Sequence, residues 1–180
     1  TVVGSVPDDV ERAAEVIASY ADRVDLFLSS GGVSVGKKDI MHGVVPALGA
    51  ERLFWRVCMK PGAPAIAYTR GRMLGIALSG NPFAAYATFE LMARPAIARL
   101  AGETDVLMPR RRAVLADAFP KPCHGRRFLR ARMEADGRVS LPDQHASGSL
   151  FSAAGCDAFV DVPAGTPPLA AGTEVDVVIL

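Results

Sequence analysis

Hydrophobic residues near the start of the chain follow two different spacings. From residue 10 to residue 21 they recur every three or four positions, and Pro7-Asp8-Asp9 suits a helix start, so the pattern predicts a helix. The apolar run 24–28 predicts a buried strand, and residues 1–6 predict a shorter one. Two strands joined by a helix are typical of a β-α-β unit, whose strands run parallel.

Hydrophobic spacing predicts further elements up to Gly102. In chain order they are a helix at 40–48, strands at 52–59, 65–68 and 73–77, and a helix at 83–100. The last two strands are expected to form a hairpin or to lie separately in the sheet. Pro95 should kink the final helix or restart it, because proline lacks the N–H that continues a helix.

Beyond Gly102 the helical periodicity gives way to short strand-like runs. These runs are 113–116, 128–133, 139–141, 158–162 and 175–179, separated by Gly and Pro turn signals. The pattern predicts an α/β domain over 1–104 and a small all-β domain over 105–180, with a boundary near 103–109. Because the first residue is not Met and few strands flank the central one, we expect an N-terminal β-α unit to precede Thr1.

Composition narrows the class of protein. The chain has 180 residues, of which 50% are hydrophobic, so a globular protein is expected. Apolar stretches end well before the roughly 20 residues of a membrane span, and no leader pattern opens the sequence, so we expect no contact with a membrane. The cysteines Cys58, Cys123 and Cys156 lack C-x-x-C spacing and are interpreted as free thiols in a cytoplasmic protein.

Positive charge is local rather than general. The net charge is only +1, but residues 110–132 contain eight Lys and Arg against one acid, Asp117. Aromatic residues are sparse there and no nucleic-acid motif is present, so a small oxyanion is the preferred ligand and nucleic acid the alternative. The histidines His42, His124 and His145 lack metal-site spacing and are interpreted as structural or solvent-exposed.

Small residues fill the segment after the strand at 24–28. The segment reads Ser29-Ser30-Gly31-Gly32-Val33-Ser34-Val35-Gly36 and is called the glycine loop below. Its glycines permit positive φ angles, and its free N–H groups and hydroxyls suit a phosphate. The same residues also fit an ordinary tight turn, or a G-x-S-x-G hydrolase motif around Ser34. Ser29-Ser30-Gly31 separate that motif from the strand, which argues against a hydrolase.

Three further positions carry candidate chemistry. Asn81 and Pro82 suit a helix start, which would emerge beside the glycine loop if the sheet is parallel there. Lys60-Pro61-Gly62 fixes a loop bearing a cation, and Arg56 shares its face if the intervening strand is regular. Asp39 is either a solvated acid at a helix start or a ligand of a divalent ion.

Several motifs occur in a fixed order along the chain. They are Val6-Pro7-Asp8-Asp9, the glycine loop from Ser30 to Gly36, Lys60-Pro61-Gly62, Gly80-Asn81-Pro82 and Gly148-Ser149. Together they resemble the C-terminal half of the molybdopterin molybdenumtransferase family, of the MoeA and gephyrin E-domain type. The resemblance implies a three-layer, MogA-like molybdopterin-binding α/β domain that lacks its first β-α unit, followed by a small, barrel-like all-β domain.

The resemblance also implies an activity. The family takes part in molybdenum cofactor biosynthesis: it inserts molybdate into adenylylated molybdopterin with the help of Mg²⁺ and releases AMP. Catalytic roles fall on Asp39, Arg56 and Lys60, with Asp39 also the metal ligand. Substrate contacts fall on Ser30, Gly31, Gly32, Ser34, Gly36, Gly80, Asn81 and Pro82, and molybdate contacts on Ser149, Arg126 and Arg130.

The chain departs from the family pattern at three points. Ser79 replaces one of two usual prolines, Arg56 stands where lysine is common, and the usual glutamate before Phe128 is absent. The resemblance implies a homodimer with its site between subunits, so this chain alone is expected to be inactive. Molybdopterin adenylyltransferase is an expected partner. The alternatives are a non-catalytic molybdopterin-binding or scaffold protein, or an adenylyltransferase itself.

Overall fold

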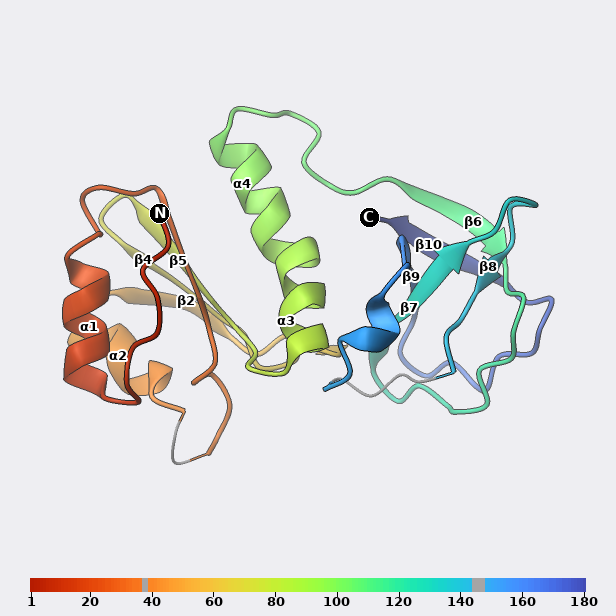
Figure 1. The fold of residues 1–180 in the computed structure, drawn as a ribbon, viewed down its shortest axis with the longest axis horizontal. Helices are drawn as coiled ribbons and strands as arrows, with labels where there is room; N and C mark the ends of the chain where they lie inside the picture. Colours follow the sequence, from red (N-terminus) through yellow and green to blue (C-terminus); the bar gives the residue numbers. More distant parts are fainter. Residues whose placement is uncertain (37–38, 144–147) are drawn as a thin grey trace. The chain divides into compact units, whose positions relative to one another are not determined.

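The computed structural model describes residues 1–36, 39–143 and 148–180. They form two compact units (Figure 1): the first contains Thr1–Val57 and Gly62–Gly80, and the second contains Cys58–Pro61 and Asn81–Leu180. No helix in these ranges is long and apolar enough to cross a membrane. The helical segment that follows Asn81 belongs to the second unit. The two units therefore do not coincide with the expected domains 1–104 and 105–180. The expected domain boundary near 103–109 stays a prediction.

The first unit is a mixed sheet with two helices. Its elements are α1 (Val10–Ala18), β1 (Leu26–Ser30), α2 (Met41–Ala47), β2 (Glu51–Trp55), β4 (Ile66–Arg70) and β5 (Met73–Leu78), with strand order β1-β5-β4-β2. Strands β1 and β5 run parallel, whereas β4 pairs antiparallel with both β5 and β2. The hairpin, one of the two arrangements expected for 65–77, is therefore the one that forms.

Helices α1 and α2 pack together through their apolar residues. Asp9 caps α1, because its carboxylate accepts a hydrogen bond of 2.7 Å from the N–H of Arg12. A Cβ added to Gly43 of α2 would lie 3.0 Å from the side chain of Val10, so glycine lets the helices approach closely. Both helices contribute to one buried cluster with residues of β4 and β5.

Two strand predictions in the first unit are wrong. Residues 1–6 form no strand, and Gly4 with its φ of 96° interrupts an extended backbone there. The expected β-α-β unit at the start of the chain is therefore absent, and β1 finds its parallel partner in β5. The strand expected over 52–59 ends at Trp55, because Arg56 has a φ of 70° and breaks the extended backbone.

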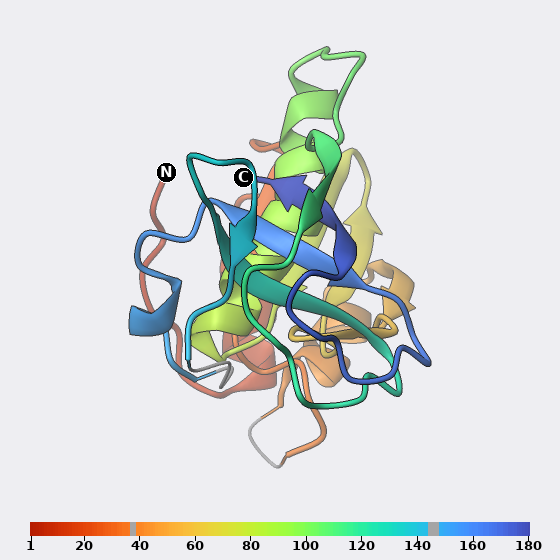
Figure 2. The same ribbon diagram turned by 90° about the vertical axis from the view of Figure 1, so that its right-hand side faces the viewer.

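The second unit combines a helical segment with a mostly antiparallel sheet. Its elements are β3 (Met59–Lys60), α3 (Pro82–Thr88), the π-helical turn η1 (Phe89–Ala93), α4 (Arg94–Leu100), β6 (Arg110–Val114), β7 (Arg126–Met133), β8 (Val139–Ser140), the 3₁₀ turn η2 (Phe151–Ala153), β9 (Ala158–Val162) and β10 (Glu174–Ile179). The strand order is β3-β7-β9-β10-β6, and β8 pairs with β7. Figure 2 shows β7, β9 and β10 side by side.

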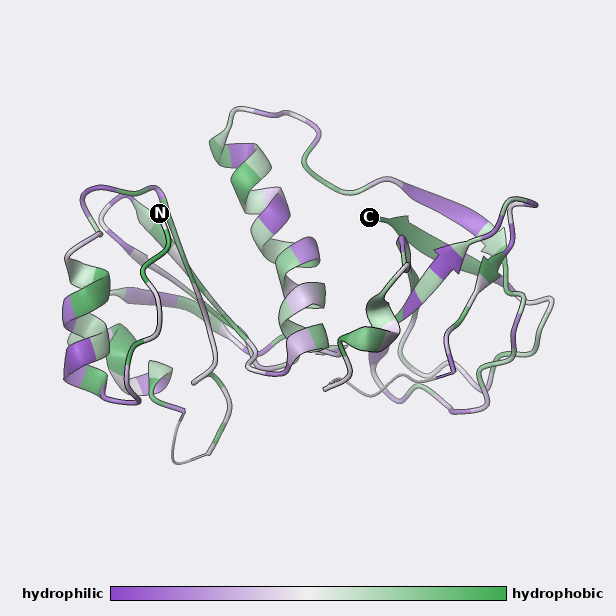
Figure 3. Cartoon of the chain, in the orientation of Figure 1, coloured by the Kyte–Doolittle hydropathy of each residue, from purple (hydrophilic) through white to green (hydrophobic). Residues whose placement is uncertain are grey.

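The all-β character expected after residue 105 is confirmed, but the sheet is not a barrel. Within the described residues β3 and β6 end the sheet without pairing with each other. One face packs on α3 through Phe83, Phe128 and Phe159, and the other face has its own apolar cluster. Strand β6 is hydrophilic beside the hydrophobic β10 (Figure 3), because it begins with three arginines. One of them, Arg112, forms an ion pair of 2.7 Å with Glu174 of β10.

Pro95 changes the helix as expected. The π-helical turn η1 ends two residues before it, and α4 then begins at Arg94. A π-turn relieves the clash between a proline ring and the carbonyl four residues earlier. Glu90, which is 3% exposed, forms an ion pair with Arg94 one helical turn later. The segment therefore stays helical from α3 through η1 to α4, and the α-helical pattern starts again at Arg94.

Candidate functional site

The glycine loop and the end of β5 leave the first sheet at the same edge. Ser30 and Leu78 are register partners in the parallel pair β1 and β5, and the N–H of Gly31 donates to the carbonyl of Leu78 at 3.0 Å. A Cβ on Gly80 would lie 3.4 Å from the Cα of Gly31, so the two segments approach closely. The end of β5 therefore meets the glycine loop at this edge of the first unit. The expected position of the helix start at Asn81 and Pro82 beside the loop stays a prediction, because both residues belong to the second unit.

The backbone of the glycine loop is arranged to offer N–H groups. Gly31 and Gly32 have φ angles of 90° and 69°, which favour glycine. The carboxylate of Asp39 accepts a hydrogen bond from the N–H of Gly36. Among the described residues, no hydrogen bond involves the N–H groups of Gly32 to Val35. These donors are therefore available to an anion.

Two aromatic side chains hold the middle of the glycine loop. The indole N–H of Trp55 donates to the carbonyl of Val33 at 3.1 Å, and His42 Nε2 lies 3.0 Å from the carbonyl oxygen of Ser34. Their rings are 4.5 Å apart at an angle of 87°, and the guanidinium of Arg56 lies 5.5 Å from the Trp55 ring. His42 thus contacts the main chain of Ser34, and this contact gives no support to Ser34 as a nucleophile.

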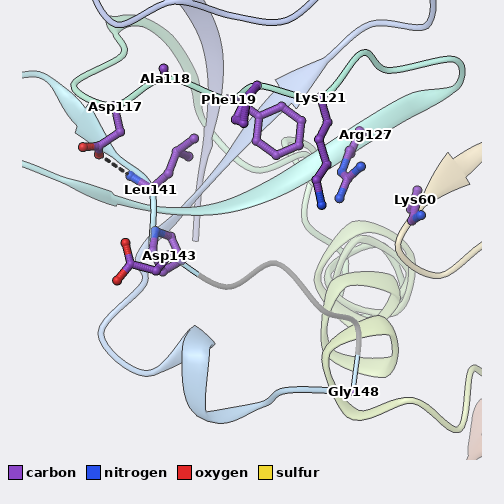
Figure 4. A pocket seen from close by; sticks show the side chains of 11 residues that line it. Lys60, Asp117, Ala118, Phe119, Lys121, Arg127, Leu141, Asp143 and Gly148 are labelled. Atoms are coloured by element: carbon purple, nitrogen blue, oxygen red, sulfur yellow. Dashed lines mark hydrogen bonds between the residues drawn. The ribbon is translucent and has the colours of Figure 1, made fainter.

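A cavity of about 670 Å³ in the second unit collects positive charge (Figure 4). Lys60, Lys121 and Arg127 line it, together with Asp117, Ala118, Phe119, Pro120, Leu141, Pro142, Asp143 and Gly148. Lys60 and Arg127 are register partners in the parallel pair β3 and β7. None of the three cations forms an ion pair with another described residue. We call this the cationic pocket; its charges suit a small oxyanion.

Arg126 lies on the other face of β7 from Arg127, because side chains alternate along a strand. Two guanidinium nitrogens of Arg126 donate to Asp161 at 2.8 Å and 2.6 Å, and Arg110 donates to the same carboxylate at 2.7 Å. Burial raises the pKa of Asp161, but the hydrogen bonds from both arginines outweigh it, so the net pKa lies below its ordinary value. Arg126, expected at the molybdate site, is thus committed to an ion pair.

Arg130 is fully buried and joins the predicted Ser149. Its guanidinium lies 3.6 Å from the centre of the Phe83 ring, and Nη1 donates to the carbonyl of Ser149 at 2.7 Å and to the hydroxyl of Ser152. Burial lowers the pKa of Arg130. The structure therefore brings Arg130 and Ser149 together through the Ser149 main chain, next to Gly148 of the cationic pocket.

The remaining expected residues separate into the two units. The first unit holds Ser30, Gly31, Gly32, Ser34, Gly36, Asp39, Arg56 and Gly80, and the second holds Lys60, Asn81, Pro82, Arg126, Arg130 and Ser149. Asn81 and Pro82 are the N-cap and first residue of α3, as expected. No group of three or more potential metal ligands occurs among the described residues. Sequence reasoning included Lys121 and Arg127 in the basic cluster expected to bind a small oxyanion, but did not single them out. It missed Trp55 and interpreted His42 as structural or solvent-exposed.

Two family models match the sequence. The model described as "Probable molybdopterin binding domain" matches residues 1–99, and the model described as "MoeA C-terminal region (domain IV)" matches residues 112–180. The chain is 34% identical over 182 residues to a protein of Bacillus subtilis (strain 168) and 32% identical over 176 residues to one of Staphylococcus aureus (strain N315), both named molybdopterin molybdenumtransferase. These alignments cover 99% and 96% of this chain but 42% of each relative.

Solved structures show the same arrangement of elements. A molybdopterin biosynthesis moeA protein from Pyrococcus horikoshii superposes with a TM-score of 0.79 and 25% identity, covering 96% of this chain and 41% of that protein. A molybdenum cofactor biosynthesis protein from Pyrococcus furiosus gives a TM-score of 0.77 and 25% identity, covering 100% of this chain and 58% of that protein. The fold is therefore shared with these proteins along nearly the whole chain.

Proposed function

This chain belongs to the molybdopterin molybdenumtransferase family, and we propose that it forms part of an enzyme that inserts molybdate into adenylylated molybdopterin and releases AMP. Family membership supports a place in molybdenum cofactor biosynthesis. The chain spans about two fifths of the length of the relatives it matches, at 42% of each, so the activity is proposed for a polypeptide that supplies the other parts.

The glycine loop would bind the phosphate of the substrate in this proposal. Backbone N–H groups of Gly32 to Val35 are available to it, and Ser30 and Ser34 add hydroxyl groups. Backbone N–H groups bind an anion although they carry no net charge, and they are not nucleophiles. Their role would therefore be to position the substrate. Gly80 and Gly31 allow the close approach of main chain that this edge requires.

The cationic pocket would bind molybdate, and its charge is the observation that carries the proposal. Lys60 and Arg127 are register partners, Lys121 lies beside Arg127 (Figure 4), and none of the three has an acidic partner among the described residues. A tetrahedral dianion would offset two of these three positive charges. Arg127 therefore takes the role expected for Arg126, while Arg130 supports the main chain at Ser149.

Asp39 would hold Mg²⁺ together with phosphate oxygens of the substrate. It is one carboxylate beside the N–H of Gly36, and Mg²⁺ is often bound by one or two carboxylates plus substrate phosphates. When bound, the ion would supply positive charge that neutralises the phosphate. Arg56 lies in the same unit and would add a further cation. Homodimerisation, binding to molybdopterin adenylyltransferase and a cytoplasmic location belong to the same proposal.

Calorimetric titration of the 180-residue chain with sodium molybdate tests the cationic pocket. Arg127→Ala should weaken binding roughly tenfold or more, as expected for the loss of a charge-assisted contact. Arg126→Ala is the matched control on the adjacent position and should leave the affinity unchanged. Equal losses in both variants, or no loss with Arg127→Ala, would contradict the assignment.

Turnover of adenylylated molybdopterin tests the reaction in a complete polypeptide that contains this chain. Lys60→Ala and Asp39→Ala should each lower the rate of AMP release, and wild-type rates in both variants would overturn the proposal. The match of residues 1–99 to a molybdopterin-binding model favours a second candidate, a binding or scaffold protein without turnover. Binding of molybdopterin with no AMP release in the complete wild-type polypeptide would favour that candidate.

A further inference from the structure

The side chains of Trp55 and His42 fix the direction of two consecutive peptide groups in the glycine loop. Trp55 Nε1 lies 3.1 Å from the carbonyl oxygen of Val33, and His42 Nε2 lies 3.0 Å from that of Ser34. The donors come from different elements: His42 lies in α2, and Trp55 ends β2. The loop is thereby tied to two parts of the first unit that are distant in sequence.

A trans peptide group points its C=O and its N–H in opposite directions. If the carbonyl of Val33 points at Trp55, the N–H of Ser34 must point away from Trp55. For the same reason, the N–H of Val35 points away from His42. Neither N–H has a hydrogen-bond partner among the described residues. The two side chains therefore turn a pair of donors away from the rings of Trp55 and His42, where an anion can reach them.

The two rings support each other. They meet edge to face at 4.5 Å, a favourable aromatic geometry, and the Arg56 guanidinium lies 5.5 Å from the Trp55 ring. Because a carbonyl oxygen only accepts, His42 must carry a proton on Nε2 to make its hydrogen bond. The ring nitrogens of Trp55 and His42 therefore both act as donors to the glycine loop.

We propose that Trp55 and His42 are positioning residues that orient the Ser34 and Val35 N–H groups for a phosphate ligand. This inference rests on the proposed function for the identity of the ligand, but the orientation of the loop is independent of it. The two residues act through the main chain and need not touch the substrate. Both residues donate from a ring N–H, so a change to phenylalanine keeps an aromatic ring at the position and removes the donor.

NMR spectroscopy of the ¹⁵N-labelled 180-residue chain tests the orientation without any ligand. The chain has a single tryptophan, so its indole N–H gives one resonance, expected to be protected from solvent exchange. Trp55→Phe should shift the amide resonance of Ser34, and His42→Phe that of Val35. Phe54→Leu, a change at the neighbouring exposed residue of β2, is the control and should move neither. Unchanged loop amides in both ring-donor variants would overturn the proposal.

Titration with inorganic phosphate and with AMP then tests the ligand role. The dissociation constant is read from the loop amides themselves, so that binding at the cationic pocket does not contribute. Each ring-donor variant should bind roughly 3- to 10-fold more weakly than wild type, the effect of one neutral hydrogen bond. Equal affinity, with the loop amides shifted, would overturn the positioning role. If the wild type binds neither anion, the phosphate role in the proposed function fails, and the amide shifts alone decide whether the rings orient the loop.

Discussion

Lys60 and Arg127 lie directly opposite each other on neighbouring parallel strands, and both line the cationic pocket. Like charges at directly opposite positions on neighbouring strands destabilise a sheet. The repulsive pair lies in a short stretch of sheet, because β3 has only two residues. A bound dianion would convert the repulsion into attraction, so stability and ligand binding should be linked at this pair.

We therefore predict that Lys60→Gln raises the thermal midpoint in buffer without oxyanions, because it removes the repulsion. It should also remove most of the stabilisation that molybdate or sulfate gives to the wild type, since a ligand stabilises only the state that binds it. Differential scanning calorimetry at low ionic strength measures both effects. Arg12→Gln, at an exposed cation of the first unit, is the charge-matched control and should retain the response to anions. A lower midpoint for Lys60→Gln without anions would contradict the prediction.

Asp161 should contribute stability that depends on pH. Hydrogen bonds from Arg126 and Arg110 hold its folded-state pKa below the ordinary value near 3.9, despite burial. A depressed folded pKa means that the contribution is present above the unfolded pKa and is lost as the pH falls through the folded pKa. We expect Asp161→Asn to cost about 1.5–3 kcal/mol at pH 7, as for hydrogen bonds to a charged group.

Urea denaturation of wild type and Asp161→Asn between pH 7 and pH 2 measures this dependence. The difference in free energy of unfolding should shrink only below pH 4 or so, where the carboxylate of the unfolded chain becomes protonated. Glu174→Gln alters an exposed acid on the neighbouring strand and is the control; its cost should be small, because exposed ion pairs contribute little. A difference for Asp161 that is constant over the whole range would rule out the linkage.

Hydrophobic periodicity predicted most of the helices and strands, because it follows which side chains are buried, and the burial of apolar side chains determines most of this fold. The pattern failed where single backbone angles decided: Gly4 ended the expected strand at 1–6, and Arg56 with its φ of 70° ended the one at 52–59. The site was only partly predictable for a related reason. Arg126 and Arg127 are adjacent and chemically identical, so only the phase of β7 shows which one faces the cationic pocket. Likewise, the contact of Trp55 with the glycine loop spans 22 residues and leaves no local signal.

The phenol of Tyr68 should stay protonated over most of the pH range. Its side chain lies fully buried across its register partner Gly75, and burial raises the pKa of the phenol to about 12. We predict that the phenol of Tyr68 ionises only in strongly alkaline solution, at about pH 12. Spectrophotometric titration of wild type and Tyr68→Phe should show that the phenolate missing from the variant forms in this range. Loss of an early-titrating component instead would contradict the burial argument.

Replacement of the same side chain should separate packing from hydrogen bonding. The hydroxyl of Tyr68 is buried without a partner among the described residues, so Tyr68→Phe removes a desolvated polar group and should leave stability unchanged or raise it by up to about 1 kcal/mol. Gly75→Ala should instead cost about 1–3 kcal/mol, because a new Cβ would overlap the Tyr68 ring. Chemical denaturation of both variants measures the contrast, and a destabilising Tyr68→Phe would show that the hydroxyl has a partner after all.

Arg130 should be irreplaceable by lysine. Its planar guanidinium lies over the Phe83 ring and at the same time donates to the carbonyl of Ser149 and the hydroxyl of Ser152. Lysine keeps the charge but has neither the planar face nor the fork of donors. We expect Arg130→Lys to destabilise the second unit by about 2 kcal/mol, the combined effect of a lost stacked contact and a lost charged hydrogen bond. It should also weaken molybdate binding, because the main chain from Gly148 to Ser152 loses its anchor beside the cationic pocket.

Denaturant titration and molybdate calorimetry on the same sample measure both effects. The matched control is Arg132→Lys, two residues further along the same strand. Arg132 is exposed and donates to the carbonyl of Gly155. This variant should change neither the free energy of unfolding nor that of molybdate binding by more than about 0.5 kcal/mol.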